Sequence, residues 1–386
     1  MHIVIAPNAF KGSLTAEEAA DCIAEGIRQS QLDCSLSLIP VADGGDGTAK
    51  LIAKKMYSKA IDVPVHDPLG RLIETTFGWV EDTKTAIIEI SDASGIKLLK
   101  KEELNPLIAN TRGAGELMLA ALEYGAQKIL IGVGGTATVD GASGLLSALG
   151  VDFTNEQGET IAKLPEGLAR LKSIDLSDLD KRVKQCEITV LCDVKNTLLG
   201  KNGAAAVFGP QKGATENDVI LLEKCLGQLN LIAEKALKVS MASMTYGGAA
   251  GGVAAGLAVF LGADLVSGIE FFLDVVNFDV ALQEADIVIT AEGSLDTQTL
   301  EGKGPYGVAL RAKNKNIPVI GLSGQVSLHT DDLMHNYFDV LLPIGHAPCS
   351  IEEAIINTKA DLIRTSCELG NLLALKKQED KMKIHR

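Results

Sequence analysis

The sequence predicts an α/β protein in which a doubly wound parallel sheet is interrupted by a large second α/β domain. Three observations carry this prediction. Short β-branched runs alternate with helical patterns at both ends of the chain. The middle of the chain instead contains closely spaced strand patterns without a helix between them. Glycine is frequent, at 39 of 386 residues, and tight strand-to-helix turns use glycine because it adopts conformations closed to other residues.

The two ends of the chain together supply five strands with intervening helices. The predicted strands cover residues 2–6, 35–40, 285–291, 317–324 and 339–345. Capping boxes at Thr15–Glu18 and Ser350–Glu353 open the first and last helices, and further helices are predicted over 47–57 and 305–313. This number of strands and this alternation predict a flavodoxin-like doubly wound domain.

The middle of the chain predicts a different architecture. Residues 61–90 show three strand patterns separated by turn signals, which predicts an antiparallel meander. A helix at 112–124, a strand at 128–133, a glycine-rich loop, a further helix and a strand at 187–192 follow. We therefore expect a discontinuous flavodoxin-like domain of residues 1–58 and 283–386, and an inserted α/β domain of residues 59–282 that contains the meander.

Composition limits the partners and the compartment. The net charge of −14 argues against bulk electrostatic binding of nucleic acid. The seven cysteines are scattered and lack a C-x-x-C pair, which favours reduced thiols and a cytoplasmic location. The apolar stretch from Ala249 to Val266 contains four glycines and Asp264, so it predicts a buried helix and no membrane span. We expect a monomer or a homodimer that binds neither nucleic acid nor membrane.

Charged residues follow the predicted strands of the flavodoxin-like domain. Ligands of open α/β sheets bind beyond the carboxyl ends of the strands. The residues expected at that edge are one cation and four carboxylates, namely Lys11, Asp43, Asp46, Glu292 and Asp296. This combination predicts a phosphorylated ligand together with a divalent cation, and oxygen ligands suit Mg²⁺.

The inserted domain has polar loops of its own. In the loop 132–141, Gly134, Gly135 and Thr136 offer backbone amides that can approach phosphate oxygens. Asp193 ends another strand, and Lys212 lies in a Gly/Pro turn. These motifs also have purely structural interpretations. Asp43 and Asp46 could be the N-cap and a turn residue of the helix 47–57. The glycines at 247–252 could allow close packing of the buried helix predicted there.

Several nucleotide-binding motifs are missing or misplaced. Neither Gly200-Lys201 nor Gly302-Lys303 has the earlier glycine of a Walker A loop, and the protein-kinase motifs H-R-D and D-F-G are absent. The pattern Gly302-x-Gly304-x-x-Gly307 begins eleven residues after Ala291, too far from its strand for a dinucleotide-binding turn. Aromatic residues, at 4%, are too few to favour a flavin site. By themselves the motifs predict an α/β enzyme that binds an anionic ligand.

Taken together, the motifs resemble the bacterial glycerate kinases that form 2-phosphoglycerate. The segments that carry the resemblance are 6–13, 43–48, 132–141, 192–194, 208–214, 249–252 and 292–296 with Gly302-Lys303, and they occur in the family's order over nearly the whole chain. Val139 stands where the family usually has Asn. The resemblance implies a flavodoxin-like domain with a second α/β domain, ATP as co-substrate, Mg²⁺, and phosphorylation of D-glycerate in the cleft between the domains.

The resemblance also implies roles for individual residues. Lys11 is expected to contact the glycerate carboxylate or the transferred phosphoryl group. Asp193 is the first candidate for the general base and Asp43 the second. Lys212 and the amides of Gly134, Gly135 and Thr136 are candidates for nucleotide phosphates, and Asp46 and Lys303 complete the substrate and phosphate contacts. Glu292 and Asp296 are candidates for Mg²⁺.

Three alternatives stay open at this point. The scaffold also suits a kinase that forms 3-phosphoglycerate, or a kinase of another small hydroxy acid. A non-catalytic sensor of sugar acids or nucleotides is more remote, because a sensor needs neither a base nor metal ligands.

Overall fold

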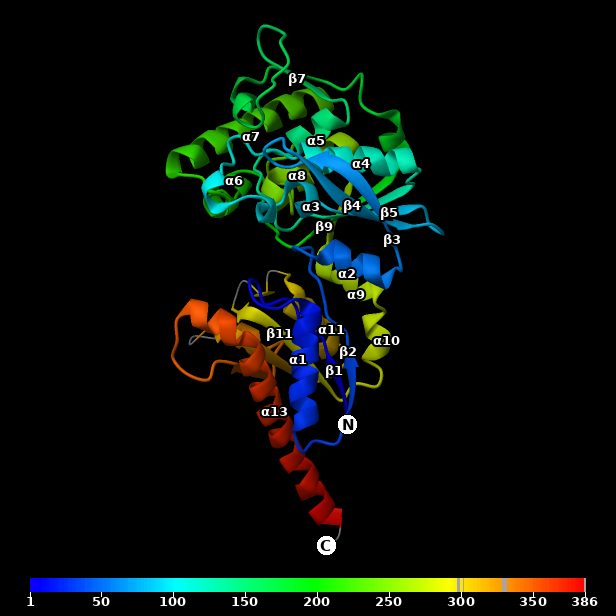
Figure 1. Ribbon diagram of the computed structural model, residues 1–386, viewed down its shortest axis with the longest axis vertical. Coiled ribbons are helices and arrows are strands. Elements are labelled where there is room, and N and C mark those ends of the chain that lie inside the picture. Colours follow the sequence, from blue (N-terminus) through cyan, green and yellow to red (C-terminus); the bar gives the residue numbers. More distant parts are fainter. Residues whose placement is uncertain (297–298, 301, 328–331, 385–386) are drawn as a thin grey trace. The chain divides into compact units, whose positions relative to one another are not determined.

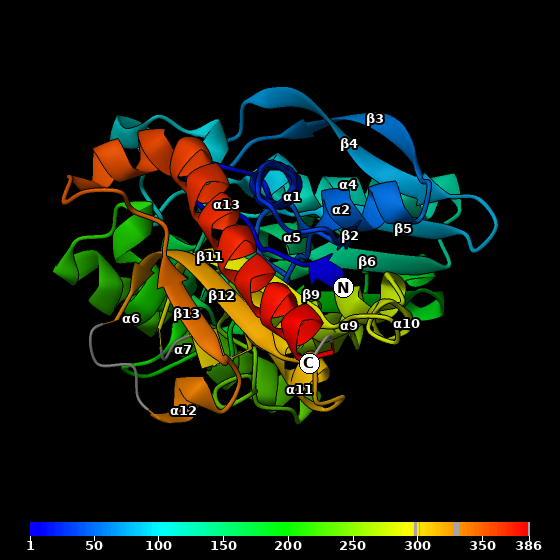
Figure 2. The same ribbon diagram turned by 90° about the horizontal axis from the view of Figure 1, so that it is seen from below.

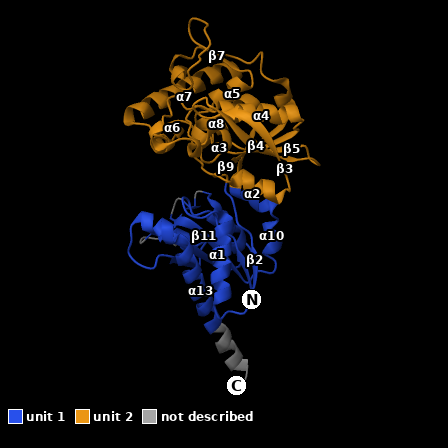
Figure 3. Cartoon of the chain, viewed as in Figure 1, with its two compact units in different colours: residues 1–43, 269–386 blue, residues 44–268 orange. Residues whose placement is uncertain are grey.

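The computed structural model describes residues 1–296, 299–300, 302–327 and 332–384 (Figure 1). Its contacts divide the chain into two compact units (Figure 3). Unit 1 comprises residues 1–43 together with the described residues from 269 onward, and unit 2 comprises residues 44–268.

Unit 1 is built on a five-stranded parallel sheet. Its strands are β1 (His2–Ile5), β2 (Ser35–Leu38), β11 (Ile287–Leu295), β12 (Val319–Val326) and β13 (Val340–Pro343), in the order β13-β12-β11-β1-β2. All four pairings are parallel. Numbered within the unit, this is the flavodoxin order 2-1-3-4-5, and the predicted fold class is confirmed. The order reverses direction between β1 and β11, where such sheets bind their ligands.

Helices cover both faces of this sheet. α1 (Ala16–Gln29) and α13 (Ile351–Ile384) pack against each other on one face, and α11 (Gly304–Lys313) lies on the other (Figure 2). The shorter helices are α9 (Gly268–Val275), α10 (Phe278–Ala281) and α12 (Asp332–His335). Both predicted capping boxes form: Thr15 pairs with Glu18, and Ser350 with Glu353. Strand and helix positions therefore follow from local sequence signals.

Unit 2 contains a mixed sheet of six strands. They are β3 (Lys59–His66), β4 (Leu72–Val80), β5 (Thr85–Glu89), β6 (Lys128–Gly132), β9 (Glu187–Cys192) and β10 (Asp264–Ser267), in the order β10-β9-β6-β5-β4-β3. β3, β4 and β5 pair antiparallel, which confirms the predicted meander, and the other strands are parallel. β7 (Asp152–Thr154) and β8 (Ser173–Asp175) form a separate antiparallel pair.

Helices lie on both faces of the sheet of unit 2 as well. The rings of Phe77 and Trp79 on β4 meet Tyr124 at the end of α4 (Arg112–Tyr124), whereas Gly78 between them approaches Ala53 of α2 (Thr48–Lys55). Because side chains alternate along a strand, α4 and α2 occupy opposite faces. The other helices are α3 (Ser91–Ser94), α5 (Ser143–Ala148), α6 (Ala204–Phe208), α7 (Glu216–Leu237) and α8 (Ala249–Leu261). Short 3₁₀ turns cover Ile96–Leu98, Lys101–Glu103, Glu166–Arg170, Lys181–Gln185 and Pro210–Lys212.

The apolar stretch near residue 250 differs from the single helix that the sequence predicts. α8 ends at Leu261, and its residues Ala250, Gly251 and Gly252 have left-handed backbone angles. A Cβ at Gly251 would collide with the carbonyl oxygen of Thr138. These glycines therefore serve close packing, as their structural interpretation proposed. Within the described part of the chain, no helix combines the length and apolar character needed to span a membrane.

The unit boundaries differ from the predicted domain boundaries. Residues 44–58 belong to unit 2, because α2 packs against β4, β5 and β6. Residues 269–282 belong to unit 1, where Arg311 of α11 forms ion pairs with Glu270 and Asp279. Both differences arise from tertiary contacts that a change in local sequence pattern does not reveal. That each unit folds as an independent domain stays a prediction.

Candidate active site

The eleven predicted site residues form two groups, one in each unit. The unit 1 cluster lies at the carboxyl edge of its sheet and contains Lys11, Asp43, Glu292, Asp296 and Lys303. The unit 2 cluster contains Asp46, Gly134, Gly135, Thr136, Asp193 and Lys212. Asp46 was expected beside Lys11 and Asp43 in one domain; it belongs to unit 2, because α2 carries the segment that begins at Gly44 onto the sheet of that unit.

Glu292 is the most deeply buried carboxyl group of the unit 1 cluster. It lies on β11 with only 7% of its surface exposed, and its Oε2 atom has no hydrogen-bond partner among the described residues. Burial and then the neighbouring Asp43 carboxylate raise the pKa of Glu292 to about 7, although Lys303 and Lys11 act in the opposite direction. Because a buried carboxylate without a partner is costly, Glu292 is suited to receive a cation or a proton.

Asp43 is held by unit 1 itself. Its Oδ2 atom accepts hydrogen bonds from Nδ2 of Asn8 at 2.8 Å and from the backbone N–H of Gly304 at 3.3 Å. Gly304 is the first residue of α11, so the carboxylate lies at the positive end of a helix dipole. The sequence suggested Asp43 as a cap of the helix after residue 47, but Gly47 occupies that N-cap and provides no side-chain bond. Sequence reasoning missed Asn8, although it lies in the motif after β1.

A cavity of about 610 Å³ opens at this edge of unit 1. Lys11, Glu292 and Lys303 line it, together with residues from the end of β13 and the first turns of α13. Two more predicted residues of the cluster, Asp43 and Asp296, do not line it. Of the predicted site residues, the cavity therefore brings together two lysines and one buried carboxyl group.

Lys212 organises the unit 2 cluster. Its Nζ atom donates to Oγ1 of Thr136 at 3.0 Å and to the carbonyl oxygen of Thr138 at 2.7 Å, and only 3% of the residue is exposed. Burial lowers the pKa of Lys212 to about 7, against the opposing effect of the Asp140 and Asp193 carboxylates. This lysine was expected to contact phosphates, and in the structure it binds the glycine-rich loop.

The glycines of that loop are in contact with another backbone segment. A Cβ at Gly134 would collide with the backbone nitrogen of Asp46 and the carbonyl carbon of Gly45. Asp46 in turn accepts a hydrogen bond from Oγ of Ser91 at 2.7 Å. The glycine at position 134 thus allows the segments 44–48 and 132–141 to pack tightly against each other.

Two buried carboxyl groups support these loops. Asp140 accepts hydrogen bonds from Thr111, Ala142 and Gly144, and burial raises its pKa. Glu89, which sequence reasoning missed, accepts the backbone N–H of Ala49 at 2.9 Å, and burial raises its pKa well above the usual value. Both anchor backbone in the first turn of a helix. No local signal distinguishes Glu89 from an ordinary strand-end residue.

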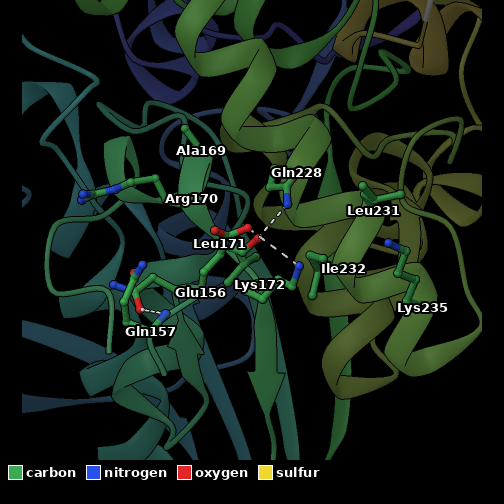
Figure 4. A pocket seen from close by; sticks show the side chains of 11 residues that line it. Glu156, Gln157, Ala169, Arg170, Leu171, Lys172, Gln228, Leu231, Ile232 and Lys235 are labelled. Atoms are coloured by element: carbon green, nitrogen blue, oxygen red, sulfur yellow. Dashed lines mark hydrogen bonds and ion pairs between the residues drawn. The ribbon is translucent and has the colours of Figure 1, made fainter. Parts of the chain in front are cut away.

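A second cavity, of about 640 Å³, lies in unit 2 between α7 and the segments around β7 and β8 (Figure 4). None of the predicted site residues lines it. Lys172 is paired with Glu156 at 3.8 Å, and Gln228 donates to the carbonyl oxygen of Leu171 at 2.6 Å. The Arg170 side chain points away from Gln228 (Figure 4). We assign no ligand to this cavity.

Comparison with known proteins gives consistent results. Residues 3–374 match the glycerate kinase family. The chain is 40% identical to a glycerate kinase of Bacillus subtilis (strain 168) over 98% of this chain and 99% of that protein. It is 41% identical to a glycerate 2-kinase of Escherichia coli (strain K12) over 97% and 98% of the two chains. A crystal structure assigned to glycerate kinase 2 from Salmonella typhimurium LT2 is similar with a TM-score of 0.79 and 39% identity, over 98% of this chain and 99% of that one.

Proposed function

This chain belongs to the glycerate kinase family, and we propose that it transfers the terminal phosphoryl group of ATP to the 2-hydroxyl of D-glycerate. The products are ADP and 2-phospho-D-glycerate. Glycerate phosphorylation itself follows from the family, and the E. coli relative is a glycerate 2-kinase. The choice of ATP and of the 2-hydroxyl is the proposal.

The observation that carries the proposal is the buried Glu292 carboxyl group beside Lys11 and Lys303. Phosphoryl transfer depends on positioning and on neutralising negative charge around the phosphates. Two lysines supply positive charge at the cavity, and Glu292 offers a carboxylate oxygen without a partner among the described residues. This set of groups suits a metal-bound polyphosphate better than an uncharged ligand.

The donor set of unit 1 also fits Mg²⁺. In the described residues, no group of three or more His, Cys, Asp or Glu side chains is placed to hold a metal by itself. Mg²⁺ is usually bound by one or two carboxylates together with phosphates and water, so Glu292 with Asp43 or Asp296 suffices. When bound, the ion would neutralise charge on the phosphates of ATP.

The chain's own residues divide the remaining work. We propose that Lys11 and Lys303 bind phosphate oxygens and that Asp193 accepts the proton of the attacking hydroxyl, with Asp43 as the alternative base. Lys212 positions Thr136 and the loop 132–141 through its two hydrogen bonds. The amides of Gly134 and Gly135 stay candidates for phosphate contacts.

The test is the identity of the product. Purified protein is incubated with D-glycerate, ATP and Mg²⁺, and ¹H and ³¹P NMR identify the phosphorylated position. Signals of 2-phosphoglycerate and ADP are expected. Formation of 3-phosphoglycerate would overturn the choice of hydroxyl, and absence of any phosphoglycerate would overturn the activity. L-glycerate and other small hydroxy acids serve as substrate controls.

Two variants test the residue roles. Asp193→Asn removes the proposed base without changing its size, and Lys11→Ala removes a phosphate-binding cation. We expect each to lower kcat/KM by more than about tenfold, which is about 1.4 kcal/mol. A smaller loss would remove that residue from the catalytic set.

The cellular setting is also part of the proposal. All seven cysteines, each within the described residues, are free thiols, which supports a reducing compartment such as the cytoplasm. We propose a monomer or a homodimer, which light scattering of the purified chain distinguishes.

A further inference from the structure

We propose that the cavity of unit 1 binds the nucleoside part of ATP, with the base against an apolar wall formed by the end of β13 and the start of α13. The inference rests on the proposed function, because it places one of the two substrates. The cavity volume of about 610 Å³ lies within the range of roughly 300–1,000 Å³ typical of pockets for cofactors and drug-sized ligands.

The polar and the apolar lining come from different parts of the sheet. Lys11, Glu292 and Lys303 belong to the loop after β1, to β11 and to the residue before α11. The apolar residues Ile344, Pro348, Ile351 and Ile355 belong to the segment after β13 and to α13. β12 separates β11 from β13, so these two strands are about 10 Å apart. An extended nucleotide has its phosphates and its base at opposite ends and can span such a distance.

The exposure of the apolar wall argues for a flat apolar group. Ile351 is 75% exposed and Ile355 is 38% exposed, although both line the cavity. D-glycerate has three carbons, a carboxylate and two hydroxyls, so it has no apolar surface to cover isoleucine side chains. A purine has two apolar faces and removes apolar surface from water when it lies against such a wall.

A buried carboxylate provides a polar contact for the base. Asp361 lines the cavity with only 6% exposure, and its Oδ1 atom is 2.7 Å from Nδ1 of His346. An ionised carboxylate only accepts hydrogen bonds, and the exocyclic amino group of adenine donates them. We therefore assign Asp361 as the acceptor for this amino group, with His346 holding the carboxylate in place.

Direct binding of ADP tests the proposal without turnover. Gly345 lines the cavity, and a Cβ there would meet open space, so Gly345→Val places a side chain in the cavity and reduces its volume. Ile351→Ser removes part of the apolar wall. The matched control is Ile356→Ser, an isoleucine of α13 that is 79% exposed and does not line the cavity. Calorimetry with ADP should show at least about tenfold weaker binding for the two cavity variants and a change within about twofold for the control.

Kinetics show which substrate the cavity holds. We expect the KM for ATP to rise in both cavity variants while the KM for D-glycerate stays within about twofold. Unchanged ADP affinity, or a rise in the KM for D-glycerate alone, would overturn the proposal. Adenosine, which has no phosphate, should inhibit competitively against ATP in the wild type and not in Gly345→Val. Failure of the wild type to phosphorylate glycerate would refute the proposed function. ADP calorimetry would still decide whether the cavity of unit 1 binds the nucleotide.

The acceptor role of Asp361 has its own readout. Inosine triphosphate carries a carbonyl oxygen in place of the adenine amino group, so the wild type should prefer ATP over it. A site built to bind a donor rejects an analogue that lacks this donor. Asp361→Asn should reduce the ratio of kcat/KM between the two nucleotides, and an unchanged ratio would remove Asp361 from the site.

Discussion

Replacement of Lys212 by methionine should change how the stability of unit 2 depends on pH. Lys212 is buried, and burial lowers its pKa from 10.5 to about 7. Between these values the unfolded chain carries the proton and the folded chain does not, so the wild type gains stability as pH rises. The full lowering of the pKa corresponds to about 5 kcal/mol, and the part between about pH 6.5 and about pH 9.5 amounts to about 3 kcal/mol.

Lys212→Met has no titrating group at this position and loses both hydrogen bonds to Thr136 and Thr138. The lost hydrogen bonds lower the stability of the variant by an amount that does not depend on pH, roughly 1–3 kcal/mol. The difference in unfolding free energy between wild type and variant should therefore grow by about 3 kcal/mol in favour of the wild type from about pH 6.5 to about pH 9.5. Other titrating groups are common to both proteins and cancel in this difference.

Urea unfolding followed by tryptophan fluorescence measures this difference. Trp79 is the single tryptophan of the chain and lies in the core of unit 2, the unit that contains Lys212. Lys224→Met is the control, because Lys224 is exposed on α7 and a solvated lysine should give a curve parallel to that of the wild type. A wild type–Lys212→Met gap that stays constant across this pH range would refute the reasoning that burial sets the protonation of Lys212.

Three further changes test other parts of the structure. Glu292→Gln should raise the Mg²⁺ concentration for half-maximal activity at least about tenfold near pH 8. In this variant the Mg²⁺ requirement should no longer increase as pH falls through about 7, the pKa of Glu292. Magnesium titrations near pH 6 and pH 8 check both effects, and an unchanged Mg²⁺ requirement would contradict the assignment. Gly134→Ala should lower the free energy of unfolding by about 1–3 kcal/mol and reduce kcat, because the added Cβ collides with the backbone of Gly45 and Asp46. Denaturant unfolding measures the loss of stability, and steady-state kinetics measure the loss of kcat. Gly227→Ala lies inside α7 with open space around the new Cβ, and it should stabilise unit 2 by roughly 0.5–1 kcal/mol; a loss of stability would show that the space is not open.

Local signals predicted most elements of the fold. The helix 112–124 and the strand 187–192 coincide with α4 and β9, and both capping boxes form. These features depend on residues close together in the chain. The residue types of a capping box and the alternation of apolar and polar residues along a strand can therefore be recognised in the sequence. The meander was predictable for the same reason, since its strands follow one another directly.

The environment of the site residues was not predictable in the same way. Lys212 and Thr136 are 76 residues apart, yet their hydrogen bond gives the lysine a supporting role in the loop. Asn8 holds Asp43 across 35 residues. Burial and partner choice of such groups depend on distant segments, so neither composition nor spacing reveals them.

From the sequence alone came the α/β class, the strands and helices, and the residue types expected at the strand ends, because these depend on local periodicity and on motif order. Only the tertiary structure decided that Asp46 belongs to unit 2, that Lys212 is buried against Thr138, and that Glu292 lies in a cavity beside Lys11. The physical reason is desolvation. The protonation and reactivity of a charged group depend on which segments bury it, and these segments are distant in the sequence and meet only in the folded chain.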